Sequence, residues 1–204
     1  MLTYIDEGHK YYWDGLNVPG VNEILLASGI SSFDHIPAHK REAGMHFGKV
    51  IHSVCELHDK DDLDLDWVIE NDLNTEYKVR PYLKGWIKFV RESGCKIISI
   101  EQKLYSKKRG FAGRHDRVII LNSLYTLLDI KTYVDSKGGT DLQLAGYEIL
   151  WNENYPAERI KNRVAVHLTP VDYQIIPYRN KSDRNDFLLA LQMYNLRKKR
   201  GLIK

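Results

Sequence analysis

The 204-residue chain is predicted to fold as an α/β or α+β sandwich, with α/β favoured, in which helices flank a central mixed β-sheet. Up to residue 93, apolar residues recur mostly at three- and four-residue steps, which is typical of amphipathic helices. From residue 96, short runs rich in Ile, Val, Leu and Tyr alternate with turn residues, which is typical of strands. Two further segments with helical spacing interrupt and follow these runs, so strands and helices share one layered domain.

The first part of the chain is predicted to be mainly helical. A Tyr-rich hairpin over residues 3–13 and a loop over 16–20 precede a short helix, 21–28, which Gly29 ends. The next helix, 42–58, carries one apolar stripe formed by Phe47, Val50, Ile51, Val54 and Leu57. The acidic run 59–66 is expected to be an exposed linker. Residues 67–93 form helix with a break near Pro81 and an end at Gly94.

The second part of the chain is predicted to supply the sheet and two more helices. Asp183 is expected to cap the last helix, because Asp at this position accepts bonds from free backbone amides. We predict one domain over residues 1–204, with 1–30 as a hairpin–helix preamble and 59–94 as a helical insertion. The expected strands are 96–105, 111–121, 124–133, 163–169 and 173–178, and the expected helices are 142–151 and 183–199.

Composition narrows the class of protein. A hydrophobic content of 43% and a charged content of 28% are ordinary for a soluble globular domain. No apolar stretch approaches the ~20 residues of a membrane span, and the N-terminus lacks the layout of a signal peptide. The two cysteines, Cys55 and Cys95, form no CxxC pair, which excludes a cysteine-built zinc or iron–sulfur site. The sequence therefore predicts a cytoplasmic protein without a membrane partner.

Charge is distributed unevenly along the chain. Residues 1–76 carry 5 Lys/Arg against 15 Asp/Glu, whereas residues 77–204 carry 25 against 12. This asymmetry favours a polyanion bound by the second part of the chain. Two oppositely charged segments that pack together would give the same asymmetry, so both interpretations stay open here.

A predicted hairpin brings two aspartates together. Asn122 and Ser123 lie between two apolar runs, and Asn tolerates the positive φ that a two-residue turn requires. A turn centred there pairs residues whose numbers sum to 245, as do those of Asp116 and Asp129. Their Cβ atoms are expected ~5 Å apart on one face of the sheet. Lys131 follows on the same face, because side chains alternate along a strand.

This arrangement predicts a divalent-metal site. Two opposed carboxylates repel each other, and a bound cation removes that penalty. Mg²⁺ or Mn²⁺ prefers oxygen ligands, which Asp116, Asp129 and the backbone carbonyl of Ile130 offer. Such a metal activates water for attack on a phosphodiester, and Lys131 would orient that water or stabilise the oxyanion. The alternative is an exposed Asp116 that bonds Arg114 or Arg117.

Two helices offer further candidates. Gly48 and His52 share one helix face, so His52 is a candidate third ligand and Gly48 permits close approach of a neighbour. Gln143 and Tyr147 lie one turn apart on the helix after the Asp129 strand, where they would hold phosphate or bases. The structural alternatives are a hydrogen-bonded His52 at the margin of the apolar stripe and a simple packing pair on the second helix.

In this order and spacing, these elements resemble the PD-(D/E)xK nuclease superfamily, in its RecB-like branch of phage-type exonucleases. The segment 18–25 also looks like the preamble of that branch, with Gly20 and Asn22 where Ser and Thr are usual. The matching residues are Gly48-x-x-x-His52, Glu101, Gly113-x-x-Asp116, Asp129-Ile130-Lys131-Thr132 and Gln143-x-x-x-Tyr147.

The resemblance implies a restriction-endonuclease-like core and a metal-dependent nuclease. It implies that Mg²⁺ or Mn²⁺ is bound by His52, Asp116, Asp129 and the Ile130 carbonyl, and that Lys131 is catalytic. Gln143, Tyr147 and, as an assistant to a second metal, Glu101 complete the site that it implies. The iron–sulfur subgroup is excluded, because two cysteines cannot hold a four-cysteine cluster.

The leading functional hypothesis is a deoxyribonuclease, an exonuclease rather than an endonuclease, in DNA recombination, repair or end processing. A phage is a plausible source, and the host cytoplasm is then the location. DNA ends are the expected partner, together with a helicase, single-strand-binding or recombination protein in trans. The basic side chains expected to contact DNA are Lys107, Lys108, Arg109 and Arg114. The alternatives are an inactive DNA-binding or regulatory protein on this fold and an unrelated α/β protein.

Overall fold

A computed structural model describes residues 1–32, 37–74, 78–132 and 139–203. Its centre is a five-stranded mixed sheet in the order β10-β9-β8-β7-β4, in which only β8 and β9 run parallel. The strands of this sheet are β4 (Lys96–Ile100), β7 (Arg117–Leu121), β8 (Leu124–Lys131), β9 (Asn162–Thr169) and β10 (Asp172–Pro177). The predicted α/β class with a mixed sheet between helices is confirmed.

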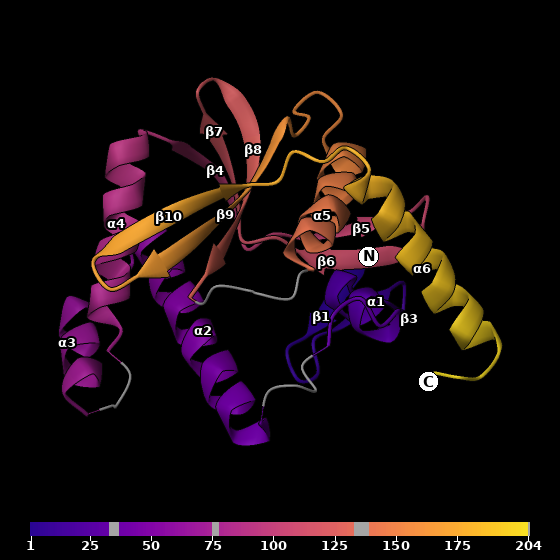
Figure 1. The fold of residues 1–204 in the computed structure, drawn as a ribbon, viewed down its shortest axis with the longest axis horizontal. Helices are drawn as coiled ribbons and strands as arrows, with labels where there is room; N and C mark the ends of the chain where they lie inside the picture. Colours follow the sequence, from indigo (N-terminus) through magenta and orange to yellow (C-terminus); the bar gives the residue numbers. More distant parts are fainter. Residues whose placement is uncertain (33–36, 75–77, 133–138, 204) are drawn as a thin grey trace.

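Helices cover both faces of the central sheet (Figure 1). One face carries α2 (Ala38–Asp59), α3 (Leu65–Asn74) and α4 (Arg80–Ser93), and the other carries α1 (Val21–Ala27), α5 (Thr140–Asn154) and α6 (Asp183–Lys199). The parallel pair β8–β9 requires a crossover connection, and α5 provides it. Among the described residues, no helix has the length and apolar character needed to cross a membrane.

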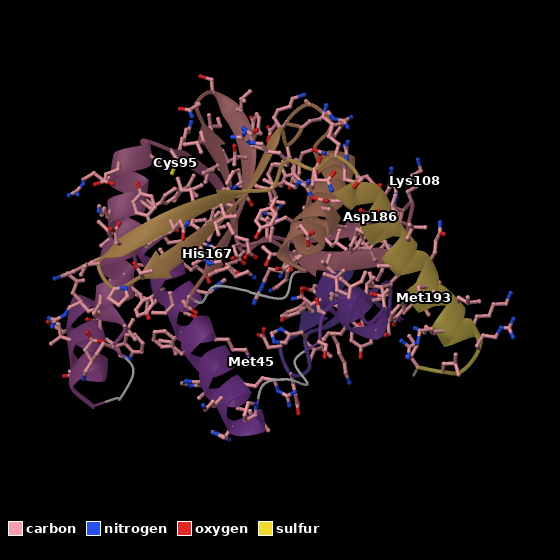
Figure 2. The ribbon with its side chains drawn as sticks, viewed as in Figure 1. Met45, Cys95, Lys108, His167, Asp186 and Met193 are labelled. Atoms are coloured by element: carbon pink, nitrogen blue, oxygen red, sulfur yellow. The ribbon has the colours of Figure 1, made fainter. Side chains whose placement is uncertain are left out.

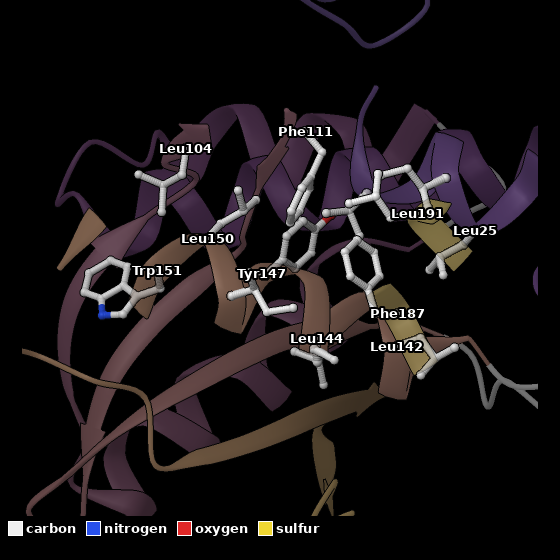
Figure 3. Packing of buried hydrophobic residues seen from close by; sticks show 14 of the residues in the cluster. Leu25, Leu104, Phe111, Leu142, Leu144, Tyr147, Leu150, Trp151, Phe187 and Leu191 are labelled. Atoms are coloured by element: carbon white, nitrogen blue, oxygen red, sulfur yellow. The ribbon is translucent and has the colours of Figure 1, made fainter. Parts of the chain in front are cut away.

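Each face of the sheet has its own hydrophobic core, because successive side chains of a strand point to opposite faces. Leu127 and Val118 belong to the core beneath α1, α5 and α6, where Tyr147 and Phe187 also lie (Figure 3). Leu128 belongs to the core beneath α2, α3 and α4. The helices of the expected insertion 59–94 therefore cover one face of the sheet together with α2.

Two smaller sheets lie beside the central one. The first contains β1 (Leu2–Ile5), β2 (Lys10–Trp13) and β3 (Leu16–Val18), and the second contains β5 (Lys103–Ser106) and β6 (Phe111–Arg114). A backbone hydrogen bond of 2.9 Å from the Ala112 amide to the Pro19 carbonyl joins the two. The loop predicted over 16–20 is partly wrong, since a third short strand forms there and pairs with β2.

Two predicted strands are each divided between two sheets. The run 96–105 breaks at Glu101, whose φ is +47°, and the run 111–121 breaks at His115 and Asp116. The halves β4 and β7 stay in the central sheet, whereas β5 and β6 leave it as a separate hairpin. Strand propensity alone shows no such break, because both halves remain extended and paired. The predicted strand over 124–133 ends at Lys131, and residue 133 lies outside the described residues.

Several helix boundaries differ from expectation for identifiable reasons. The acidic run 59–66 is not all linker, because Asp59 ends α2 with a fully buried side chain and α3 begins at Leu65. Asp183 is not a cap: it is the first residue of α6, and its buried carboxylate pairs with Arg163 at 2.8 Å. The break near Pro81 and the stop at Gly94 are confirmed, although residues 75–77 lie outside the described residues.

Candidate metal-binding and catalytic site

The β7–β8 hairpin has the predicted register. Arg117 pairs with Leu128 and Val118 with Leu127, so paired numbers sum to 245. Asn122 and Ser123 have φ values of +49° and +64°, as a turn with two left-handed residues requires. The ladder ends at Arg117 and Leu128, and one further pair in the same register would set Asp116 opposite Asp129, on the face of the sheet that carries α5.

The two aspartates are both buried but make different contacts. Asp116 is 9% exposed, and its Oδ2 accepts a hydrogen bond of 2.7 Å from the Ile130 amide. Asp129 is 2% exposed, and its Oδ2 forms an ion pair with Lys131 Nζ at 2.8 Å. Burial raises the pKa of Asp129, with Asp116 adding to the effect and Lys131 opposing it.

His52 extends from α2 to these carboxylates. Its Nδ1 lies 3.5 Å from Asp116 Oδ2 and 3.8 Å from Glu101 Oε1, and its Nε2 donates to the Ile130 carbonyl at 2.9 Å. Burial lowers the pKa of His52, but Asp116 and Glu101 outweigh burial and raise it from 6.5 to about 9. Without a metal, the two carboxylates thus favour the protonated imidazole, and a cation bound at Nδ1 would take the place of that proton.

One ligand atom from each of His52, Glu101 and Asp116 lies within 4.8 Å of the other two. We call these three residues the donor cluster. An imidazole nitrogen and two carboxylate oxygens are donors that Mn²⁺ accepts, and Mg²⁺ favours the oxygens. The chemistry of this set thus fits a divalent cation.

The donor cluster differs from the expected ligand set in two positions. Asp129 lies outside the cluster, since its carboxylate faces Lys131, and Glu101 takes part at the cluster instead. The Ile130 carbonyl faces His52 and accepts its Nε2–H, so it orients the imidazole. His52 and Asp116 are brought together as the sequence predicts.

Glu101 is fixed by two arginines. Its side chain accepts contacts from Arg114 Nε at 3.1 Å and Arg117 Nη1 at 3.2 Å. Its own amide donates to the Asp116 carbonyl at 2.8 Å, which continues the backbone pairing past the ends of β4 and β7. These contacts hold the Glu101 carboxylate against Asp116.

Behind the site lies a buried ion pair, Arg117 with Asp59, that was not predicted from the sequence. Arg117 and Asp59 both have fully buried side chains, and Arg117 Nε lies 2.7 Å from Asp59 Oδ2. Trp86 Nε1 donates to Asp59 Oδ1 at 2.7 Å, and the guanidinium lies 5.7 Å from the Trp86 ring centroid. The available signal was Arg117 itself, because alternation places this charge on the apolar face with Ile119.

The residues expected on α5 gather around Lys131. Its ammonium donates to Gln143 Oε1 at 3.1 Å, and Gln143 Nε2 donates to Asn22 Oδ1 at 3.0 Å and more weakly to the Tyr147 hydroxyl at 3.5 Å. Asn22 belongs to the N-terminal preamble, so α1 contributes to the site. Burial raises the pKa of Tyr147 well above its usual value, which keeps the hydroxyl protonated.

The four basic residues expected to contact DNA lie in two places. Lys107, Lys108 and Arg109 form the turn between β5 and β6, and Arg114 lies at the end of β6 next to Glu101. Figure 2 shows Lys108 well separated from His167, the β9 residue that pairs with Lys131. Arg109 forms an ion pair with Glu153, so its charge is partly balanced.

Comparison with known proteins gives a fold but no family. No protein-family model and no curated protein matches the chain. The crystal structure of a "Putative exonuclease" from Eubacterium rectale matches with a TM-score of 0.52 and 12% identity, covering 78% of this chain and 69% of that one. A structure of the protein SSO0001 has a TM-score of 0.38 and 14% identity, covering 72% and 73%. The first likeness establishes a shared fold.

Proposed function

We propose that this protein is a metal-dependent deoxyribonuclease, an exonuclease, that hydrolyses phosphodiester bonds at DNA ends. The observation that carries the proposal is the donor cluster beside Lys131: three ligand atoms within 4.8 Å of one another, and an ammonium that is held by Asp129 and Gln143. The exonuclease mode is supported by the fold shared with the Eubacterium rectale protein. We further propose that residues 1–204 act as one PD-(D/E)xK nuclease domain of the RecB-like branch.

The ligands in this proposal are His52, Glu101 and Asp116, with Asp129 and the Ile130 carbonyl at the margin. When bound, Mg²⁺ or Mn²⁺ supplies positive charge to the phosphate and lowers the pKa of a water molecule. His52 presents Nδ1 because its Nε2–H is held by the Ile130 carbonyl. Arg114 and Arg117 keep the Glu101 carboxylate turned toward Asp116.

Lys131 is the proposed catalytic cation. Its side chain is 13% exposed, and its ammonium is held by Asp129 at 2.8 Å and Gln143 at 3.1 Å, so it occupies one position at the rim of the site. A preorganised cation there stabilises negative charge that develops on a phosphate oxygen. Gln143 acts through Lys131, and its contacts with Asn22 and Tyr147 set the direction of its amide.

The biological setting is part of the proposal. The proposed nuclease acts in DNA recombination, repair or end processing in a cytoplasm, with a helicase, single-strand-binding or recombination protein as its partner. Lys107, Lys108, Arg109 and Arg114 are proposed to contact the DNA backbone. Binding should then weaken steeply with salt, since neutralised phosphates release counterions. Unchanged affinity and salt slope after substitution of Lys107, Lys108 and Arg109 by Gln would remove these contacts from the proposal.

The test is a cleavage assay on end-labelled single- and double-stranded DNA with Mg²⁺, Mn²⁺ or EDTA. The variants are Lys131→Ala and Asp116→Ala, and the matched control is Lys88→Ala. Lys88 also pairs with an aspartate at 2.9 Å but lies on α4, away from the donor cluster. We expect metal-dependent release of label that the control retains and both site variants lose by a factor of about 100 or more.

Each other outcome has a definite meaning. Cleavage that resists EDTA, or that survives both site substitutions, contradicts the mechanism. DNA binding without cleavage supports the inactive DNA-binding alternative. Labelled strands that shorten step by step show digestion from the unlabelled end, whereas immediate release of the label shows digestion from the labelled end, so the two patterns give the polarity. Internal cuts contradict the exonuclease mode and indicate an endonuclease.

A further inference from the structure

A surface of aromatic rings and cations begins at the donor cluster and follows the β5–β6 hairpin. We call it the aromatic–cationic strip, and it also includes side chains of β1 and β2. β5 and β6 pair in register, with Lys103 opposite Arg114. The members of the strip are Tyr4, Trp13, Lys103, Tyr105, Lys107 and Arg114.

Rings and cations alternate closely along the strip. The Trp13 and Tyr105 rings are stacked, with centroids 4.4 Å apart and an interplanar angle of 14°. Lys107 Nζ lies 5.3 Å from the Trp13 centroid, and Lys103 Nζ lies 4.7 Å from that of Tyr4. Arg114 also lies over the Tyr4 ring, at 5.6 Å, so each ring group has a cation within reach.

The strip has a direction because one end touches the donor cluster. Arg114 contacts both the Tyr4 ring and, at 3.1 Å, the Glu101 carboxylate. From there Lys103 and Tyr105 point outward on alternate residues of β5, and the intervening Leu104 and the following Ser106 are buried. Lys107 follows in the turn. A ligand that lies along the strip therefore reaches the metal-binding residues at its Arg114 end.

Simple packing explains only part of this surface. Tyr11, 7% exposed, forms the interior of the small N-terminal core together with Val18 and Ala112. Tyr4, Trp13 and Tyr105 pack against that core but remain partly exposed. The cations over them are on exposed or half-buried side chains that core packing does not require. If these rings served only to stabilise the fold, we would expect them to be buried or to be covered by apolar side chains.

Stacking of a nucleobase on an aromatic ring of the strip is stronger than the contact of a lysine with that ring. A cation over an exposed ring changes an equilibrium constant by about 2- to 5-fold, whereas a nucleobase stacked on an aromatic side chain contributes about 5- to 150-fold. A base can therefore displace a lysine from a ring, and the released ammonium is then free to pair with the phosphate. Only unpaired bases can do this, because bases in a duplex are already stacked and paired.

We propose that the aromatic–cationic strip binds single-stranded DNA by base stacking and leads it to the donor cluster. This inference rests on the proposed nuclease function and specifies its substrate. Arg114, at the junction, would contact the phosphate nearest the cleavage site. A metal-dependent nuclease with this strip acts on single strands or on ends that have been unwound.

The test measures binding in EDTA, where metal-dependent cleavage does not interfere. The probes are a fluorescein-labelled 20-nucleotide oligo-dT, a duplex of equal length and an abasic strand of equal length, which keeps the phosphates without the bases. The variants are Trp13→Leu and Tyr105→Leu, which retain apolar bulk but remove the stacking surface. The control is Tyr173→Leu, because Tyr173 is a similarly half-buried ring near a lysine, Lys88, on the α4 face of the sheet.

We expect each strip variant to weaken oligo-dT binding by about 5- to 150-fold and to leave duplex and abasic binding within about 2-fold. The control should match the wild type on all three probes. Unchanged oligo-dT binding, or equal losses on oligo-dT and abasic strands, would overturn the inference. If circular dichroism shows that Trp13→Leu does not fold, Trp13→Phe replaces it. Oligo-dT that still binds Trp13→Phe in a base-dependent way, but no longer quenches the tryptophan fluorescence that it quenches in the wild type, supports stacking at Trp13.

The two proposals fail in different ways. Base-dependent binding without cleavage under Mg²⁺ or Mn²⁺ supports the strip and contradicts the nuclease function. Metal-dependent cleavage without base-dependent binding supports the nuclease function and contradicts the strip.

Discussion

The buried pair between Arg117 and Asp59 provides a sharp test of how the site is supported. Asp59→Asn keeps the shape of the side chain and an acceptor for Trp86 but removes the negative charge next to Arg117. Both side chains are fully buried and 2.7 Å apart, so solvent screens little of their interaction. Removing one partner of such a pair costs about 3–5 kcal/mol, because the other charge stays buried.

The contact of Arg117 with Glu101 at 3.2 Å leaves part of its charge balanced, which favours the lower end of that range. With an m-value of roughly 2 kcal/mol/M, a loss of about 3 kcal/mol lowers the urea midpoint by about 1.5 M. The assay is urea unfolding followed by circular dichroism. The matched control is Asp62→Asn, in the same acidic run but exposed, which should change stability by less than about 0.5 kcal/mol.

Equal midpoints for Asp59→Asn and Asp62→Asn would refute this reasoning. A second variant separates charge from packing: Asp59→Leu combined with Arg117→Met removes both charges and retains bulk. We expect the double variant to recover much of the stability lost in Asp59→Asn, since apolar replacement of a buried pair is often neutral. A double variant less stable than Asp59→Asn would show that the cost is not an unpaired charge.

Three further predictions concern the site and its scaffold. The folded-state pKa of His52, about 9, exceeds its unfolded value of 6.5, so its stabilising effect is present below pH 6.5 and is lost as pH rises toward 9; metal-free wild type should lose more thermal stability over this interval than His52→Gln, and parallel melting curves would contradict this. Gly113→Ala places a methyl group 2.7 Å from a Tyr147 ring carbon and should cost about 1–3 kcal/mol and lower kcat, which urea unfolding and the cleavage assay measure. Gly85→Ala brings Cβ within 3.0 Å of the Thr169 carbonyl and closer still to the Asp172 carbonyl. It should lower the free energy of unfolding by about 3 kcal/mol, while kcat of the folded fraction stays unchanged.

Local patterns in the sequence were sufficient to predict the β7–β8 hairpin. The turn residues Asn122 and Ser123 and the alternation of the flanking runs fix its register, up to the pair of Arg117 with Leu128 that precedes Asp116 and Asp129. Helical periodicity also places Gln143 and Tyr147 on one face of the helix, whereas the contact of Gln143 with Lys131 is a finding of the structure. These features depend on residues close in sequence.

Features set by distant residues were not predictable in the same way. Asp59 appears exposed from its acidic surroundings, yet Arg117, 58 positions later, keeps it buried. The role of Glu101 was implied by resemblance alone, since its place beside Asp116 depends on the pairing of β4 with β7. The division of two strands between sheets leaves no mark on strand propensity, because each half remains paired.

That division has a mechanical consequence for the site. Glu101 and Asp116 lie where the paired strands β4 and β7 give way to the hairpin of β5 and β6. A backbone hydrogen bond of 2.8 Å joins these two residues, and one of 3.3 Å from the His115 amide to the Gln102 carbonyl follows on the hairpin side. The spacing of the two carboxylates therefore depends on the backbone pairing at this junction. Because Leu104 and Phe111 anchor the hairpin in the core beneath α5, burial of the hairpin also keeps the junction in place.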